Sequence, residues 1–178
     1  MEEEWSNIKN KGKKMITKAN LNDIKQIMEI INKTVEEMKS YNNTQWDENY
    51  PQDKDFEKDI ELGDLYVDKE NNTITGFICV NYIEPAEYND LNWSKDEKCM
   101  IIHRMAVNPK CRNKGIGSKL MNFAEELAIK NGVNYLKTDT YSINTKMNSL
   151  FRKFNYELVG QMSFLGKEQP FYCYEKTL

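Results

Sequence analysis

Two glycines and several basic side chains in the middle of the chain have the types and spacing needed to bind an anion. They form the run Arg112-Asn113-Lys114-Gly115-Ile116-Gly117, with Ser118 next and the cations Lys110 and Lys119 at either side. A helix is expected to begin here, and a helix start presents unpaired N–H groups and a partial positive charge to phosphate oxygens. Glycine lets the backbone approach a pyrophosphate without an intervening Cβ. The run is therefore compatible with a phosphate site, but on this segment alone a plain helix start with a solvated basic edge is the favoured interpretation.

Two common nucleotide motifs do not fit this run. A dinucleotide fold needs G-x-G-x-x-G directly after a strand, whereas here Leu120 stands at the third glycine position and residues 108–114 precede the glycines. The P-loop string G-x-x-x-x-G-K-[ST] is absent from the sequence. The phosphate-bearing ligand is therefore expected to belong to another class.

Hydrophobic periodicity predicts the helices that surround this run. Leu21, Ile24, Met28, Ile31 and Val35 recur at helical spacing and form one apolar stripe. Either of two asparagines, at positions 20 and 22, can cap this helix. Further helices are expected over residues 51–63, 116–131 and 144–154.

Strand patterns alternate with these helices. They cover residues 15–18, 64–68, 73–82, 98–107, 135–141, 157–164 and 171–176. The second and third strands are expected to form a hairpin around Glu70-Asn71-Asn72. A strand–helix–strand–helix–strand core behind an antiparallel hairpin indicates an α/β (α+β) fold with a mixed sheet covered by helices.

Composition excludes several classes of protein. The chain has 178 residues, 39% hydrophobic and 30% charged, which suits one domain with a sizeable core. A net charge of −3 disfavours nucleic acid as a partner, and no apolar run reaches membrane-spanning length. The acidic residues after Met1 do not resemble a secretory signal. Residues 1–14 lack apolar periodicity and are interpreted as a flexible extension.

The four cysteines are expected to be free thiols. They lie at positions 79, 99, 111 and 173, too far apart in sequence for a C-x-x-C metal or redox motif. Small buried hydrophobic side chains in a reducing, cytoplasmic protein are the simplest interpretation, and no metal site is predicted.

Three sequence blocks occur in an informative order. Met105-Ala106-Val107-Asn108-Pro109 is similar to "L-A-V-x-P", the glycine run fits R/Q-x-x-G-x-G/A, and residues 144–156 are similar to "N-x-x-A-x-x-L-Y-x-K-x-G-F". Together they resemble the GCN5-related N-acetyltransferase (GNAT) superfamily, with a domain covering residues 15–178. The resemblance implies a mostly antiparallel sheet of about seven strands, flanked by about four helices. The sheet would splay between the strand ending at Val107 and the strand starting at Tyr135.

The resemblance also implies that acetyl-coenzyme A binds in this splay. The pantetheine arm would pair with open strand backbone, and the pyrophosphate would lie on the first N–H groups of the helix. A backbone N–H near Met105 or Ala106 would hold the thioester carbonyl. The implied coenzyme-binding residues are Met105, Ala106, Val107, Arg112, Asn113, Lys114, Gly115, Ile116, Gly117, Ser118, Asn144 and Phe151.

Transfer to an amine requires a proton acceptor. His103, the only histidine, stands two residues before Met105 in a string similar to the "L-H-x-L-A-V" of the arylalkylamine branch of the superfamily. A packed or surface histidine is the alternative interpretation. Glu84 and Asp139, near strand ends, are weaker candidates for the base, because carboxylates there are more often solvated.

Two positions depart from the family pattern. Phe151 stands where the family usually has a tyrosine that protonates the leaving thiolate, so water, Tyr141 or unassisted departure must serve instead. Asn155 replaces the family's glycine, and asparagine tolerates the left-handed conformation. The first departure affects the mechanism, whereas the second has little effect on the fold.

The acceptor is expected to contact aromatic and acidic side chains from the first loop and the last hairpin. Aromatic faces and carboxylates suit a cationic amine. The leading prediction is acetylation of a small primary amine, such as an amino acid, polyamine or aminoglycoside, by direct attack in a ternary complex. A protein or peptide amine, or a non-catalytic acyl-coenzyme A sensor, are the alternatives, and a homodimer stays open. Trp46, Tyr50 and Tyr82 are the predicted acceptor-binding residues, and the wider set adds Asp47, Glu48, Glu84, Phe164 and Tyr172.

Overall fold

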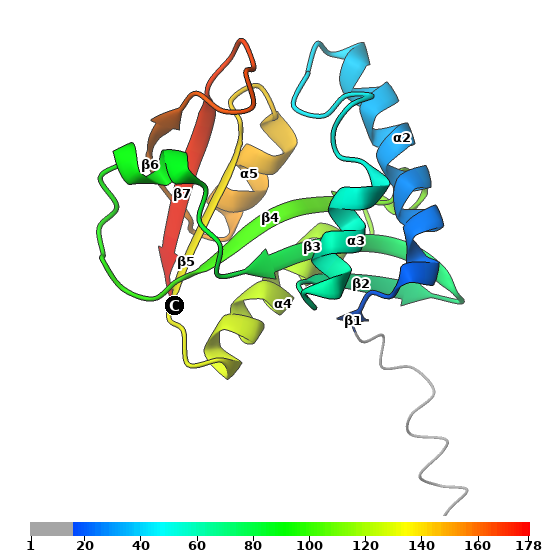
Figure 1. The fold of residues 1–178 in the computed structure, drawn as a ribbon, viewed down its shortest axis with the longest axis horizontal. Helices are drawn as coiled ribbons and strands as arrows, with labels where there is room; N and C mark the ends of the chain where they lie inside the picture. The colour runs from blue at the N-terminus through cyan, green and yellow to red at the C-terminus, as the bar shows by residue number, and fades with distance from the viewer. Residues whose placement is uncertain (1–15) are drawn as a thin grey trace, which may run out of the picture.

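One open sheet of seven strands forms the centre of the computed structural model, which describes residues 16–178 (Figure 1). The predicted extension over residues 1–14 therefore lies outside the described residues. The strand order is β1-β2-β3-β4-β5-β7-β6. The strands are β1 Thr17–Lys18, β2 Leu65–Glu70, β3 Thr73–Asn81, β4 Met100–Val107, β5 Tyr135–Tyr141, β6 Glu157–Met162 and β7 Phe171–Thr177.

Neighbouring strands run antiparallel except at one place. β4 and β5 are parallel, while every other neighbouring pair of named strands is antiparallel. The predicted α/β (α+β) fold with a mixed, mostly antiparallel sheet is therefore confirmed. So is the predicted hairpin, formed by β2 and β3.

The parallel pair separates after three residues. Met100 to Ile102 pair with Leu136 to Thr138, and no register continues beyond them. The hydroxyl of Thr138 donates to the carbonyl of Ile102 at 2.9 Å, which is the last link before the strands diverge. Figure 1 shows the two strands spreading apart toward α5 and α2. This confirms the predicted splay, which leaves the last residues of β4 with an unpaired edge.

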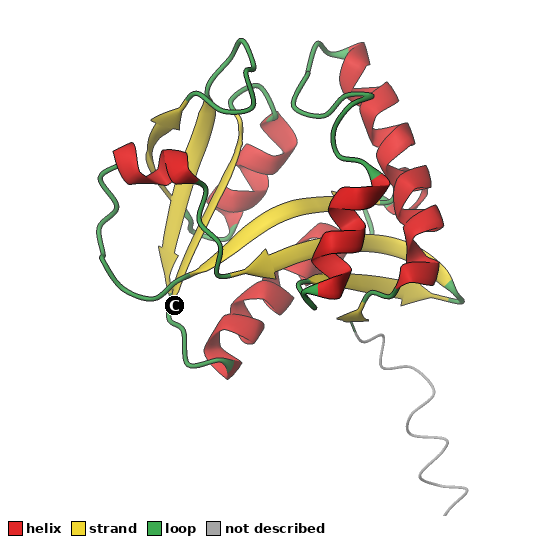
Figure 2. Cartoon of the chain, in the orientation of Figure 1, coloured by secondary structure: helices red, strands yellow, loops and turns green. Residues whose placement is uncertain are grey.

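Four α-helices cover the two faces of the sheet (Figure 2). α2 and α3 pack with β2 and β3 on one face, where Ile30, Phe56 and Phe77 are buried together. α4 and α5 cover the other face, where Leu120 and Phe151 join the second cluster. None of the described helices combines the length and apolarity needed to span a membrane. The helices are α2 Ile24–Ser40, α3 Asp53–Glu61, α4 Ile116–Lys130 and α5 Thr145–Lys153.

The apolar stripe of the first helix lies differently from the prediction. Leu21 is 60% exposed, because it belongs to a short 3₁₀ helix that precedes α2 and does not share its 3.6-residue period. Ile27, Ile30 and Met38 are buried in its place, together with the predicted Ile31. Asn20 caps this start by accepting from the backbone N–H of residue 22, as the sequence allowed.

A β-bulge interrupts β4 beside the splay. Met105 pairs with Ile78 and Ile102 pairs with Val80, so β4 has one residue more than β3 between these two pairs. The bulge therefore consists of His103 and Arg104, which lie between these two pairs on β4. A bulge re-aims the side chains of the strand that carries it. No pattern in the sequence indicates this irregularity.

Candidate active site

A cleft of about 660 Å³ opens where β4 and β5 diverge. Its walls come from the end of β4, the start of α4, one face of α5 and the end of α2. The cleft thus collects residues that are widely separated in sequence. Those predicted to bind the coenzyme and found in its lining are Met105, Ala106, Val107, Arg112, Asn113, Gly115, Ile116, Gly117, Ser118, Asn144 and Phe151. Lys114 does not line the cleft, and its side chain is exposed.

The start of α4 has the geometry expected of an anion site. Gly115 is the N-cap residue with φ 74°, and Asn113 just before it has φ 60°. No side chain caps this helix start, so the N–H groups of its first turn have no side-chain acceptor. A Cβ on Gly115 would meet no atom within 4 Å, so glycine is needed there for its left-handed conformation.

Two cations at the rim of this cleft share one carboxylate. Glu37, on α2, forms ion pairs with Arg112 and with Lys146, the latter at 2.6 Å. Burial would raise the pKa of Glu37, but hydrogen bonds and charge from both cations lower it overall. Arg112 precedes α4 and Lys146 begins α5, so Glu37 links the two sides of the splay. Arg112 was predicted, whereas Lys146 stands at a variable position of the sequence block and was missed.

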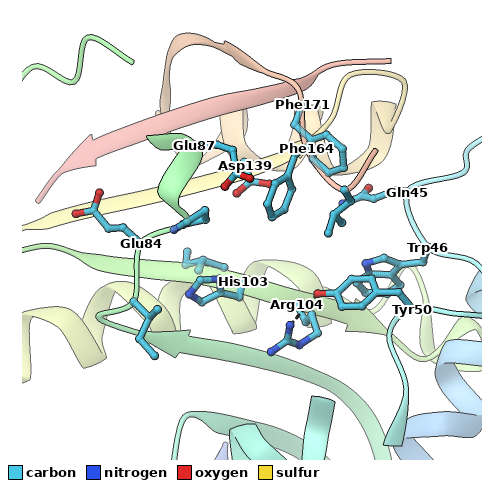
Figure 3. Close-up of a pocket in the computed structure, with 14 residues that line it drawn as sticks. Gln45, Trp46, Tyr50, Glu84, Glu87, His103, Arg104, Asp139, Phe164 and Phe171 are labelled. Carbon is cyan, nitrogen blue, oxygen red and sulfur yellow. Dashed lines mark hydrogen bonds between the residues drawn. The ribbon is translucent and has the colours of Figure 1, made fainter. Parts of the chain in front are cut away.

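A second, smaller pocket of about 280 Å³ lies next to the cleft (Figure 3). Gln45, Trp46, His103 and Asp139 line both spaces, so they form the junction between them. The remaining walls come from the α2–α3 loop, the segment after β3 and the β6–β7 hairpin. The predicted Trp46 and Tyr50 line this pocket. Tyr82 lines neither space; it is 46% exposed and lies under the ammonium of Lys98.

The loop that carries Trp46 is fastened across the splay. Gln45 Oε1 accepts from Asn144 Nδ2 at 2.8 Å and from the hydroxyl of Thr140 at 3.3 Å. Asp47 pairs with Lys167 of the β6–β7 hairpin at 2.6 Å. These contacts hold Trp46, which is 7% exposed, between the cleft and the smaller pocket.

Asp139 is the carboxylate at the junction. Burial raises its pKa to about 6, the hydrogen bond from Tyr88 opposes this rise, and the nearby charge of Glu87 adds to it. The hydroxyl of Tyr88 donates to Oδ2 at 2.7 Å. A carboxylate with a pKa near neutrality is suited to accept a proton at physiological pH. The sequence analysis ranked Asp139 below His103 as a candidate base. The pKa and the position of Asp139 favour the reverse ranking.

His103 is held in its neutral form. Burial lowers its pKa to about 4, and the charge of Arg104 acts in the same direction. Nε2 lies 2.7 Å from Oδ1 of Asn81, an oxygen that also accepts the backbone N–H of Ile83. We assign Nε2 as the donor in this contact, because the amide oxygen can only accept. That nitrogen is therefore engaged, and the imidazole is a weak base in this environment.

The other two predicted catalytic residues are committed to structural contacts. Glu84 lines the smaller pocket, but its carboxylate points away from His103 and meets Lys137 Nζ at 3.0 Å (Figure 3). Burial would raise the pKa of Glu84, yet hydrogen bonds from Cys99 and Lys137 lower it overall. Tyr141 is 1% exposed, lines neither space, and accepts the backbone N–H of Gln169 at 3.0 Å.

Arg104 is a pocket residue that the sequence analysis missed. Its guanidinium makes a bidentate pair with the buried Asp59, at 2.6 and 3.0 Å. It also donates to the hydroxyl of Tyr50 at 2.7 Å, which orients the predicted aromatic side chain. Arg104 lies at the bulge in β4 and lines the smaller pocket. No local sequence pattern predicts this bulge.

Groups suited to a metal ion or a covalent intermediate are not found here. Within residues 16–178, no cluster of three His, Cys, Asp or Glu side chains is arranged to hold a metal. All four cysteines are free, and none lines the cleft or the pocket. Burial raises the pKa of the Cys99 and Cys173 thiols to about 12, which makes them poor nucleophiles.

Comparison with known proteins agrees with this geometry. The acetyltransferase (GNAT) family matches residues 27–156 of this chain. The chain is also similar to the uncharacterized N-acetyltransferase YesJ of Bacillus subtilis (strain 168), with 23% identity over 113 residues. That alignment covers 60% of this chain and 59% of YesJ, so it spans less than two thirds of that relative.

Solved structures show the same fold over nearly the whole chain. A GNAT-family acetyltransferase from Streptococcus agalactiae 2603 has a TM-score of 0.80 at 23% identity, covering 92% of this chain and 95% of its own. A Staphylococcus aureus Mu50 protein, provisionally described as an acetyltransferase, has a TM-score of 0.74 at 30% identity, with coverages of 92% and 98%. The structure of yncA from Salmonella typhimurium, solved with its cofactor acetyl-CoA, has a TM-score of 0.66 at 19% identity, with coverages of 92% and 93%.

Proposed function

The chain belongs to the acetyltransferase (GNAT) family, and on that basis we propose that it moves an acetyl group from acetyl-coenzyme A to the primary amine of a small molecule. Acetyl-coenzyme A is the acyl donor of this family. The identity of the amine and the roles of individual residues are the proposal. One observation carries it: the cleft of about 660 Å³ and the pocket of about 280 Å³ meet at Asp139, His103, Gln45 and Trp46.

The residues of the larger cleft fit the coenzyme. The uncapped start of α4, with its left-handed Gly115, suits a pyrophosphate, and Arg112 and Lys146 supply cations at the rim. The unpaired edge of β4 from Met105 to Val107 offers N–H and C=O groups to the amides of the pantetheine arm. Phe151, which is 1% exposed, forms part of the apolar wall. When bound, the coenzyme supplies the acetyl group as an activated thioester.

The smaller pocket suits a small amine better than a peptide. At about 280 Å³ it holds a compact molecule, and carboxylate and aromatic side chains dominate its walls. Asp139 at the junction attracts an ammonium group and then accepts its proton, because its pKa of about 6 lies close to neutrality. His103 stays neutral and lines the wall at the bulge.

Direct attack of the amine is the route that this geometry supports. Both substrates find adjacent spaces, so they can bind at the same time. No cysteine lines either space within the described part of the chain, which argues against an acyl-enzyme on sulfur. Phe151 has no proton to donate, and Tyr141 is buried and lines neither space. We therefore assign protonation of the leaving thiolate to water.

Release of free thiol from acetyl-coenzyme A, measured against a panel of amines, tests this function. Turnover with small amines, and a loss of about 100-fold or more in kcat for Asp139→Asn, are the expected results. His103→Ala is expected to lower turnover far less than Asp139→Asn. Preference for peptide amines over every small amine would favour the alternative acceptor. Binding of acetyl-coenzyme A without turnover on any amine would favour a sensor and refute the proposal.

A further inference from the structure

The charges that line the smaller pocket do not cancel. Arg104 is neutralised by its bidentate pair with Asp59. Glu84 is neutralised by Lys137 at 3.0 Å. His103 carries no charge near neutral pH, because burial lowers its pKa to about 4. These pairs contribute no net charge to the pocket.

Two carboxylates are left without a compensating cation. Asp139 receives only the neutral hydroxyl of Tyr88, at 2.7 Å. Glu87, on the short 3₁₀ helix Ala86–Asp90, is half-buried and makes no ion pair with any residue in the described range 16–178. Figure 3 shows the two carboxylates close together on one wall. The charge of Glu87 also contributes to the raised pKa of Asp139, which is the effect expected when no cation stands between them.

Aromatic rings form much of the rest of the pocket lining. Trp46 and Tyr50 come from the α2–α3 loop, and Phe164 and Phe171 come from the β6–β7 hairpin. Phe164 packs edge-on against Phe171, with 5.4 Å between their centroids. Rings of this kind favour an aliphatic chain that carries positive charge, through apolar contact and cation–π attraction.

We propose that the acceptor is an aliphatic amine with a second positive charge, its reacting nitrogen at Asp139 and its other cationic nitrogen at Glu87. This inference rests on the proposed function and names the substrate class for the same pocket. Asp139 lines both spaces, so the nitrogen beside it lies next to the coenzyme cleft. Glu87 lines only the smaller pocket, so the nitrogen beside it lies outside the coenzyme cleft.

Two further points set this class apart from other amines. An amino acid would bring a carboxylate into a wall that already has two uncompensated negative charges, which is unfavourable. A simple monoamine would leave the carboxylate of Glu87 without a partner in a partly buried place. The two positive charges of a dication compensate the negative charges of both carboxylates.

Three acceptors of equal chain length provide the test: 1,4-diaminobutane, butylamine and 4-aminobutanoate. We measure kcat/KM for each at neutral pH with saturating acetyl-coenzyme A and the full-length wild-type chain. The diamine is expected to exceed butylamine by at least about tenfold, since a charge-assisted hydrogen bond is worth about that factor. The amino acid is expected to be the poorest of the three.

Glu87→Gln tests the residue, with Asp90→Asn as the matched control. Asp90 lies on the same short helix, is exposed, and lines neither space, so its variant removes one negative charge from outside the pocket. The ratio of kcat/KM for the diamine to that for butylamine is expected to fall at least about fivefold in Glu87→Gln and to stay within about twofold in Asp90→Asn. Calorimetric affinity for coenzyme A reports whether each variant is folded.

The outcomes separate the two levels of the proposal. If wild type acetylates amines but its kcat/KM for butylamine or 4-aminobutanoate equals that for the diamine, the dication inference is wrong and the proposed function stands. An unchanged ratio in Glu87→Gln would likewise overturn the role given to that residue. If no amine supports thiol release although coenzyme A binds, the proposed function and the inference fall together.

Discussion

Replacing Glu37 with glutamine is expected to strengthen the binding of coenzyme A. Glu37 shares its carboxylate between Arg112 and Lys146, the two cations at the rim of the cleft. A phosphate that approaches these cations must displace the carboxylate, so the protein competes with its own ligand. The Glu37→Gln variant removes this competitor and leaves both cations in place.

The size of the effect follows from the exposure of the pairs. The Glu37 side chain is 29% exposed, Arg112 is 31% exposed and Lys146 is 60% exposed, so solvent screens both interactions. Each such pair contributes about 0.2–1 kcal/mol. Removing the competition at both should therefore lower the Kd by about twofold to thirtyfold, equivalent to about 0.4–2 kcal/mol.

Isothermal titration of coenzyme A into wild type and Glu37→Gln measures this change. Glu36→Gln is the control, because Glu36 is the exposed neighbour on α2 and makes no ion pair within the described chain. The gain in Glu37→Gln should shrink at about 1 M salt, where the Debye length is about 3 Å. An unchanged or higher Kd in Glu37→Gln would mean that the carboxylate does not compete with the ligand and instead positions the two cations for it.

Three other predictions concern the same sites. Asp139→Asn should lower kcat, and the wild-type kcat/KM should rise with pH through about 6, the raised pKa of Asp139; a profile without this limb in wild type would remove Asp139 from the base role. The pKa of His103 in the folded protein is about 4, below its usual 6.5. The free energy of unfolding should therefore decrease as the pH falls from 6.5 to 4. The folded pKa of Asp139 lies above its usual 3.8, at about 6, so protonation opposes that loss; Asp139→Asn should therefore lose stability more steeply between pH 6.5 and 4 than wild type, and equal slopes would contradict the two assignments. Gly115→Ala should lower the free energy of unfolding by about 1–2 kcal/mol, because φ is 74° at this position, and it should also weaken coenzyme binding. Denaturant titration measures the first effect and calorimetry the second. The prediction is wrong if neither quantity changes.

Most residues of the cleft that we assign to the coenzyme could be predicted, because their signals are local. The glycine run, its cations and the strand before it lie within about a dozen residues, so helix-start physics and the family pattern apply directly. The Lys114 side chain is exposed and does not line the cleft, because a contiguous motif does not tell which of its side chains turn outward. Leu21 was misplaced for a similar reason, since the period of α2 does not extend into the 3₁₀ helix before it.

The smaller pocket could be predicted only in part, because its contacts join segments that are distant in the sequence. Arg104 meets Asp59, 45 residues away, and Tyr88 meets Asp139, 51 residues away. The raised pKa of Asp139 comes from its burial, which no single segment of the sequence reveals. The bulge in β4 depends on how β3 and β4 pair, so it could not be predicted from the sequence of either strand.

Calorimetric titration of acetyl-coenzyme A into wild type and Arg112→Glu measures whether the space between the diverging β4 and β5 holds the acyl donor. We expect saturable one-to-one binding to wild type and much weaker binding to Arg112→Glu, because a cation at the rim becomes an anion in that variant. Absence of binding to wild type, or equal affinity in the two proteins, would contradict this expectation.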